Sequence, residues 1–235
     1  MNRLLAKLIL LSMVTSCLAG TLKDNFNDGK LDGWSPLIWD NGFNSIHKAE
    51  KGDLVLKCIG SCTIITIGEK SWADYTVSVR VKIVKQQSVQ DWIEAAGIVL
   101  RITPNSPNIS SFYAFYLGTF GFQPKSAHIF YTRPQGGGVH NFKSESFEWK
   151  LNRWYRLQAV ANGNQFKCYV DGKLILEYKD STYQAGQVGL AAACHTTIAH
   201  FDDFMVSGDQ IPDFNLSVTA QSKLATVWGD LKYTQ

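Results

Sequence analysis

The stretch N-G-N-Q-F-K-C-Y-V-D-G-K-L-I-L-E-Y, residues Asn162–Tyr178, holds two turn signals and two alternating runs. Its Asn-Gly and Asp-Gly dipeptides tolerate the positive φ angles that a tight type I′ hairpin turn requires. Between the turns Phe166, Cys168 and Val170 share one face, because successive side chains of a strand alternate. The run after the second turn alternates in the same way, with an apolar set of Leu174, Leu176 and Tyr178. The stretch therefore predicts hairpins of an antiparallel sheet with a core on one side.

Nearly every segment after residue 20 repeats this two-residue period. The clearest is D-Y-T-V-S-V-R-V-K-I-V at Asp74–Val84, with five apolar side chains on one face and four polar ones on the other. Similar runs are Leu54–Cys58, Cys62–Ile67, Ala95–Ile102, Phe112–Phe120, Ala127–Thr132, Trp154–Ala161, Val188–Cys194 and His200–Val206. They give about a dozen strands, more than one open sheet usually carries. We therefore predict an all-β fold in which two antiparallel sheets pack face to face as a sandwich.

The first 19 residues have the features of an export signal. Basic residues supply a positive start, and the apolar run that follows is shorter than the roughly 20 residues that span a bilayer. Two processing modes fit the exit V-T-S-C-L-A-G: lipidation of Cys17, which we favour, or cleavage after Ala19. We expect the sandwich to cover residues 20–208 and residues 209–235 to form a C-terminal tail. The expected location is the extracellular space, the periplasm or, through a lipid anchor, the cell envelope.

Composition limits the classes of partner. The chain has 235 residues, of which 45% are hydrophobic, and this is enough for one sizeable core. The formal net charge is +3 without any block of basic residues, so we do not expect a nucleic acid partner. No G-x-S-x-G, H-E-x-x-H or phosphate-binding glycine loop is present. We expect a monomer whose only link to a membrane is the lipid anchor.

Four cysteines remain after Cys17, and four cysteines allow three disulfide pairings. In C-I-G-S-C the two ends can face each other across a short hairpin loop, which favours a Cys58–Cys62 disulfide. Cys168 and Cys194 lie in strand-like runs and can meet across neighbouring strands. The alternative is that this second pair is buried without a bond, because free cysteine packs well in cores.

An ordered set of motifs resembles a known superfamily. The set comprises D-N-F-N-D-G-K-L-D-G-W at Asp24–Trp34, W-Y-R-L-Q-A-V at Trp154–Val160, F-K-C-Y-V-D-G-K-L-I at Phe166–Ile175, G-Q-V-G-L at Gly186–Leu190 and H-F-D-D-F-M-V at His200–Val206. It resembles the concanavalin A-like lectin/glucanase domains of bacterial secreted proteins, which include laminin-G-like and 3-keto-disaccharide hydrolase-like domains. The first motif looks like the opening strand of such domains. The resemblance implies a jelly-roll sandwich that holds a glycan, an oligo- or polysaccharide, on its concave sheet.

Polar and aromatic side chains opposite the core are candidates to bind this glycan. Sugars offer hydroxyl groups for hydrogen bonds and apolar ring faces for stacking, which suits arginine, glutamine and exposed aromatic side chains. By strand parity the candidates are Arg80, Arg101, Tyr116 and Gln158. Loop tryptophans placed to line the rim of a cleft are Trp39, Trp92 and Trp149. Tryptophans at positions that indicate core packing are Trp34, Trp72 and Trp154.

Carboxylates near both ends of the predicted domain form a candidate metal site. The resemblance implies that some relatives bind a structural calcium ion on the convex side. Asp24 and Asp28 can approach Asp202 or Asp203, since the terminal strands of such sandwiches often pair. Oxygen ligands suit calcium. The alternative is that these carboxylates only accept hydrogen bonds in turns. We expect no other cofactor.

Three functions from different classes are consistent with the sequence. Catalytic members of the glucanase branch carry E-x-D-x-x-E on one strand, and this motif is absent. We therefore favour an exported, non-catalytic carbohydrate-binding module and assign no catalytic residue. One alternative is a glycoside hydrolase or 3-keto-disaccharide hydrolase-type enzyme, with acids from Asp91, Glu94, Glu145 or Glu148. The other is a protein-interaction module at the cell surface.

Overall fold

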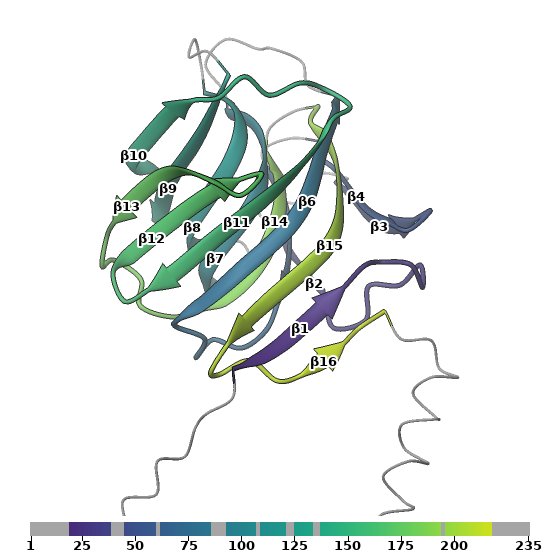
Figure 1. The fold of residues 1–235 in the computed structure, drawn as a ribbon, viewed down its shortest axis with the longest axis horizontal. Coiled ribbons are helices and arrows are strands. Elements are labelled where there is room, and N and C mark those ends of the chain that lie inside the picture. The colour runs from purple at the N-terminus through teal and green to yellow at the C-terminus, as the bar shows by residue number, and fades with distance from the viewer. Residues whose placement is uncertain are drawn as a thin grey trace, which may run out of the picture.

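The structure, a computed structural model, describes residues 19–38, 45–59, 62–85, 93–106, 109–120, 125–133, 137–193 and 196–217. Within these ranges the chain forms sixteen β-strands and no helix. Accordingly, the described part of the chain contains no helix of the length and apolarity needed to cross a membrane. The strands form two sheets that pack face to face (Figure 1). The predicted all-β sandwich of two antiparallel sheets is confirmed.

The first sheet has nine strands in the order β13-β12-β11-β6-β15-β1-β16, and a β3-β4 hairpin joins it where β4 pairs with β15. Its strands are β1 (Gly20–Asp24), β3 (Ile46–Glu50), β4 (Asp53–Lys57), β6 (Tyr75–Lys85), β11 (Trp154–Asn162), β12 (Gln165–Val170), β13 (Lys173–Lys179), β15 (Ile198–Gly208) and β16 (Phe214–Asn215). The pair β1–β16 is parallel, whereas β1 and β15 are antiparallel. The terminal strands of the domain therefore lie side by side, as predicted.

The second sheet has seven strands in the order β10-β9-β8-β7-β14-β5-β2. Its strands are β2 (Ser35–Ile38), β5 (Cys62–Ile67), β7 (Ile93–Ser106), β8 (Ile109–Phe120), β9 (Ser126–Arg133), β10 (Gly137–Ser146) and β14 (Gln187–Ala193). Every pair in this sheet is antiparallel. Figure 1 shows this sheet behind the nine-stranded one.

The main core lies between the two sheets and follows from strand alternation. On β6, Val77, Val79 and Val81 are fully buried, whereas the intervening Arg80 and Lys82 face outward. Full burial of such a valine side chain stabilises the fold by about 1.5–3 kcal/mol. The same alternation along the facing strands completes one continuous apolar layer.

The hairpins around β12 test the opening prediction. Asp171 and Gly172 connect β12 to β13 with φ angles of 48° and 79°, as a type I′ turn requires. Leu174 was predicted to face the core, and this prediction is wrong, because its side chain is 42% exposed. A register shift after Cys168 places Leu174 opposite Tyr169 on the outer face. A β-bulge of this kind carries no clear signal in the alternating pattern.

The segment predicted as the opening strand, Asp24–Trp34, is mostly turn. Strand β1 ends at Asp24, and the chain then adopts positive φ angles at Phe26, Gly29 and Gly33. Trp34 nevertheless packs in the core as predicted, with 8% of its surface exposed.

The C-terminal tail begins docked on the sandwich. Strand β16 pairs with β1, and Leu216 packs in the main core. The Ser217 hydroxyl donates a hydrogen bond of 2.7 Å to Asp24. Residues 209–217 are thus part of the domain, and the remainder of the tail lies outside the described residues.

Candidate functional site

The outer face of the nine-stranded sheet carries a band of charged and polar side chains, here called the polar face. Its members come from β4, β6, β11 and β15. They are Asp53, Arg80, Lys82, Trp154, Arg156, Gln158, His200, Asp202 and Asp203. Cross-strand register places Arg156 opposite Arg80, and Asp202 opposite Arg80 on the other side. Strand pairing thus gathers into one band residues that lie far apart in the sequence.

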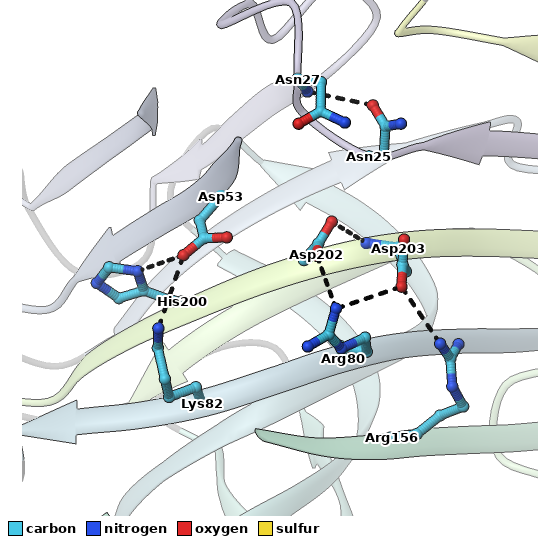
Figure 2. A network of polar contacts seen from close by, with 9 residues as sticks. All are labelled: Asn25, Asn27, Asp53, Arg80, Lys82, Arg156, His200, Asp202 and Asp203. Carbon is cyan, nitrogen blue, oxygen red and sulfur yellow. Dashed lines mark hydrogen bonds and ion pairs between the residues drawn. The ribbon is translucent and has the colours of Figure 1, made fainter. Parts of the chain in front are cut away.

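Two arginines and two aspartates form the centre of the polar face (Figure 2). An Arg80 nitrogen lies 3.1 Å from Asp202 and 3.6 Å from Asp203, and an Arg156 nitrogen lies 3.3 Å from Asp203. Partial burial raises the pKa of Asp202, and the neighbouring negative charge of Asp203 acts in the same direction. These groups are partly exposed, so each pair contributes at most about 1 kcal/mol to stability.

A β-bulge in β15 aims Asp203 into this band. Two residues of β15, Asp203 and Phe204, occupy the interval that a single residue spans on β6. Asp203 has a φ angle of 50°, in the left-handed region that non-glycine residues adopt at a cost. Its backbone N–H donates a hydrogen bond of 2.6 Å to the Asp202 carboxylate, which helps to hold this conformation.

A second cluster on the polar face joins an imidazole to a carboxylate. His200 Nδ1 lies 2.9 Å from Asp53 Oδ2, and the Lys82 ammonium lies 3.8 Å from the same oxygen (Figure 2). A carboxylate that fixes one imidazole nitrogen leaves the other nitrogen as a base or an acceptor.

Trp154 belongs to the polar face, so the prediction that it packs in the core is wrong. The Arg80 guanidinium lies 4.6 Å and the Lys82 ammonium 4.4 Å from the centre of its ring. Its indole is thus in contact with two cations. Trp149, predicted at a rim, is instead buried and donates a hydrogen bond to the Gly118 carbonyl oxygen.

Beside the centre of the polar face lies a hollow of about 300 Å³. It is lined by Lys23, Asp24, Asn25, Ser78, Arg156, Asp203, Phe204, Met205 and Asn215. Ser78 is 4% exposed, and its hydroxyl has no hydrogen-bond partner in the described part of the chain.

The outer face of the seven-stranded sheet is different, because it carries a second apolar cluster, here called the aromatic layer. Its buried members are Ile64, Ala95, Val99, Ile102, Phe112, Ala114, Tyr116, Phe130, Ala191 and Ala193. His128 lies within it, fully buried, and neither of its ring nitrogens forms a hydrogen bond with a residue that the structure describes. The centres of the Phe142 and Tyr116 rings lie 5.6 Å and 6.0 Å from that of the imidazole. Burial lowers the pKa of His128 to about 3.

The predicted glycan-binding residues are only partly brought together. Arg80 and Gln158 lie on neighbouring strands of the polar face, whereas Tyr116 is buried in the aromatic layer on the other sheet. Trp39 and Trp92 lie outside the described residues.

Arg101 is not available to a ligand, and its prediction as a glycan contact is wrong. Its side chain is fully buried, and its guanidinium donates hydrogen bonds to the Ala73 and Tyr183 carbonyl oxygens at 2.9–3.2 Å. The guanidinium also lies 3.5 Å from the Asp74 carboxylate. Arg101 of β7 therefore connects the segment before β6, through Ala73, to the segment between β13 and β14, through Tyr183.

The four aspartates of the predicted calcium site are engaged in other contacts, although Asp24 and Asp203 line the same hollow. Asp24 accepts hydrogen bonds from Trp34 Nε1, from the Phe26 N–H and from Ser217. Asp28 accepts one from the Lys30 N–H, while Asp202 and Asp203 pair with arginines. In the part of the chain that the structure describes, no three His, Cys, Asp or Glu residues are placed to hold a metal ion. The calcium ion stays a prediction.

The predicted disulfides are not seen among the described cysteines, which are Cys58, Cys62 and Cys168. Cys168 is buried in the main core, and this burial raises the pKa of its thiol. Cys194 and the predicted lipidation site, Cys17, lie outside the described residues.

The alternative catalytic acids do not form a pair on an outer face. On the described strands of the seven-stranded sheet the carboxylates are Glu94 and Glu145. Glu94 lies opposite Thr119 and is fully buried on the core side of β7, whereas Glu145 lies opposite Ala127 on the edge strand β10 and is exposed. Glu148 is exposed just after β10, and Asp91 lies outside the described residues.

Sequence reasoning missed Ser78, Arg156 and the Asp53–His200 pair. Strand parity could have found Arg156, which lies two residues before Gln158 on the same face. The Asp53–His200 pair joins β4 to β15, so predicting it would have required knowledge of which strands are neighbours in the sheet.

Comparisons with known proteins agree with this fold. The family model of the 3-keto-alpha-glucoside-1,2-lyase-like domain matches residues 21–207. No curated protein sequence matches the chain significantly.

Among solved structures, a CBM66 carbohydrate-binding module from Bacillus subtilis superposes with a TM-score of 0.59 and 17% identity, over 75% of this chain and 96% of that one. The catalytic domain of a laminarinase from Thermotoga petrophila superposes with a TM-score of 0.53 and 11% sequence identity, over 80% of this chain and 97% of that one. A protein of unknown function with a galectin-like fold, from Bacillus subtilis, superposes with a TM-score of 0.55 and 13% sequence identity, over 81% of this chain and 96% of that one. Identities this low show a shared concanavalin A-like fold.

Proposed function

Because the chain belongs to the family of 3-keto-alpha-glucoside-1,2-lyase-like domains, we propose that it is an exported carbohydrate-binding domain that holds a saccharide on its polar face. The family name points to a glucoside ligand, and the module from Bacillus subtilis with the same fold is described as carbohydrate-binding. Export and attachment at the cell envelope through Cys17 are part of the proposal and rest on the N-terminal segment.

The observation that carries this proposal is the mixture of donors and acceptors on the polar face. The side chains of Arg156 and Asp203 are 46% and 45% exposed, so a ligand can reach them. A carboxylate can accept hydrogen bonds from two neighbouring sugar hydroxyls, and a guanidinium can donate several in a fixed geometry. Gln158 adds both a donor and an acceptor on the same face.

Binding without hydrolysis is the form of the proposal that the carboxylates favour. A glycosidase needs two carboxyl groups on opposite sides of the scissile bond. On the polar face Asp202 and Asp203 are adjacent and both pair with Arg80, and the third carboxylate, Asp53, pairs with His200 and Lys82. On the other sheet Glu94 is fully buried and Glu145 is exposed on the edge strand β10, so the two do not share one open surface.

The test is to incubate the purified chain with a panel of soluble polysaccharides and to measure retention and released sugar together. Retention without release supports the proposal. Release of reducing sugar contradicts it and moves attention to the carboxylates.

A second candidate is an eliminating enzyme, and the Asp53–His200 pair favours it. In a 3-keto-glucoside the ketone at C3 acidifies the hydrogen on C2. A base removes this proton while the C1–O bond breaks, which forms a C1=C2 double bond. The departing aglycone oxygen takes up a proton, from the protonated base or from water, and leaves as an alcohol. His200 can serve as that base because Asp53 holds its Nδ1, and the ammonium of Lys82, which contacts the same Asp53 oxygen, is near to stabilise the enolate oxygen.

The second candidate is tested by following the ultraviolet absorbance of the enone product from a synthetic 3-keto-α-glucoside. Activity that His200→Ala abolishes, and that the exposed-residue control His47→Ala keeps, supports it. The absence of product with the wild-type chain rejects it.

A further inference from the structure

The hollow beside Asp203 lies where the edge pairing of β15 changes from one strand to another. Residues Ile198–Phe201 of β15 pair with β4, whereas Phe204–Gly208 pair with β1. Asp202 and Asp203 lie between these two pairings, and no residue of β1 or β4 pairs with them. The gap leaves a recess bordered by β1, β6, β11, β15 and β16.

Ser78 at the base of this recess has a hydroxyl group without a partner. Its Oγ is inaccessible to water and makes no hydrogen bond with any described residue. A buried hydroxyl that stays unpaired destabilises a fold, and native structures leave few such groups without a reason. The neighbouring strands place Gln158 on one side of Ser78 and Met205 on the other. Ser78 is one of the residues that line the hollow. A molecule bound there lies next to it and can supply the missing partner once the Ser78 side chain turns toward it.

Asp203 gives a second, independent indication of a ligand. Its carboxylate reaches the hollow only because the residue adopts a strained left-handed conformation in the β-bulge. Glycine would adopt the same conformation without a Cβ clash. Strained side chains of this kind concentrate at binding and active sites.

We propose that this hollow is a subsite for one neutral sugar unit, in which Asp203 accepts hydrogen bonds from two adjacent hydroxyl groups and Ser78 bonds a third. This inference rests on the proposed carbohydrate-binding function and adds the place and chemistry of recognition. The hollow of about 300 Å³ is at the lower end of the usual range for small-molecule sites, which suits a single ring.

The charges of the lining favour a neutral ligand. The lining contains two cations, Lys23 and Arg156, and two carboxylates, Asp24 and Asp203, so its formal charges cancel. An anionic sugar would meet the exposed carboxylate of Asp203, and a cationic one would meet Lys23 and Arg156. A hydroxyl group both donates and accepts, so it can satisfy both kinds of side chain. Asn25 and Asn215 add amide groups with the same double capacity.

The test compares Ser78→Ala and Asp203→Asn with the wild-type chain and a matched control. Thr76→Val removes a hydroxyl from the same strand outside the hollow. Glucose, galactose and mannose serve as neutral probes, and glucuronate serves as the anionic probe. Binding is followed by isothermal titration and by NMR shifts, and folding by thermal unfolding.

Ser78→Ala should weaken binding of the neutral probe by about fivefold, the factor of one neutral hydrogen bond. It should leave the melting temperature unchanged or higher, because it removes an unpaired buried hydroxyl. Asp203→Asn should weaken binding by about tenfold, since asparagine tolerates the positive φ angle and loses only the charge. Thr76→Val should bind as the wild type does.

Four results would overturn parts of this account. Unchanged affinity in both hollow variants, with binding by the wild type, rejects the hollow and leaves the proposed function standing. If the variants bind more weakly only because less of the protein is folded, the hollow is also rejected as a binding site. Tighter binding of glucuronate than of any neutral probe rejects the neutral class. If neither these probes nor the polysaccharide panel binds, both the function and the subsite are wrong.

Discussion

Replacing His128 by phenylalanine should remove a large part of the acid sensitivity of the fold. The imidazole is fully buried among aromatic rings, and within the described ranges neither of its nitrogens has a hydrogen-bond partner. Burial therefore keeps it neutral and lowers its pKa from 6.5 to about 3. The unfolded chain takes up a proton as the pH falls below 6.5, but the folded chain does not. Stability from this group is thus complete above pH 6.5 and is lost as the pH falls toward 3.

The size of the effect follows from these two pKa values. Between about pH 8 and pH 5 the shift lowers the unfolding free energy of the wild type by about 2 kcal/mol. His128→Phe should lack this loss, whatever its absolute stability, because phenylalanine does not titrate. Phenylalanine is larger than histidine, so the substitution can change the unfolding free energy at every pH. The readout is therefore the change in unfolding free energy between the two pH values, and not the unfolding free energy at one pH.

Urea unfolding followed by tryptophan fluorescence at both pH values measures this difference. The exposed residue His47 gives the control, since His47→Phe should keep the pH dependence of the wild type. Equal pH dependence in wild type and His128→Phe would refute the reasoning. It would mean that water reaches His128, and hence that the aromatic layer is open to a ligand.

Three further substitutions test single contacts. Arg101→Met should lower the unfolding free energy by roughly 2–4 kcal/mol, because it leaves the Ala73 and Tyr183 carbonyl groups without donors. The saccharide affinity of the folded protein should not change. A selective loss of affinity in titration would show that Arg101 belongs to the binding site. Gly97→Ala should yield little folded protein, since a Cβ there would lie 2.2 Å from the Phe115 carbonyl oxygen; a wild-type circular dichroism melt would contradict this. Trp34→Phe should cost about 1–3 kcal/mol in urea unfolding, because the buried Asp24 carboxylate loses its indole donor; wild-type stability would show that the bond is not important.

Strand alternation predicted most of the fold because it depends on local sequence alone. The prediction of Cys62–Ile67 matches β5, and that of Asp74–Val84 differs from β6 by one residue at each end. Strands without strict alternation, such as β3 and β10, were not predicted. Most residues of β3 are exposed, so hydrophobicity gives no signal there.

The site was less predictable because it depends on sheet order and on bulges. Parity alone placed Arg80 and Gln158 on outer faces, but parity cannot say which sheet a strand joins. It failed for Arg101, which lies at a register shift in β7 and has a φ angle of 49°. The positive φ angle of Asp203 was also missed, although aspartate is depleted in regular strands and enriched at positive φ, so an Asp-Asp pair inside a strand is a weak signal for a bulge.

The central claim is that a saccharide binds to the polar face and not to the aromatic layer. Its most direct test is affinity electrophoresis of three proteins in gels that contain each polysaccharide of the panel. These are the wild type, an Arg156→Ala/Gln158→Ala double variant of the polar face, and His128→Phe in the aromatic layer. We expect one or more polysaccharides to retard the wild type and His128→Phe equally, and to leave the double variant unretarded. Retardation of the double variant to the wild-type extent, or its loss in His128→Phe alone, would contradict the claim.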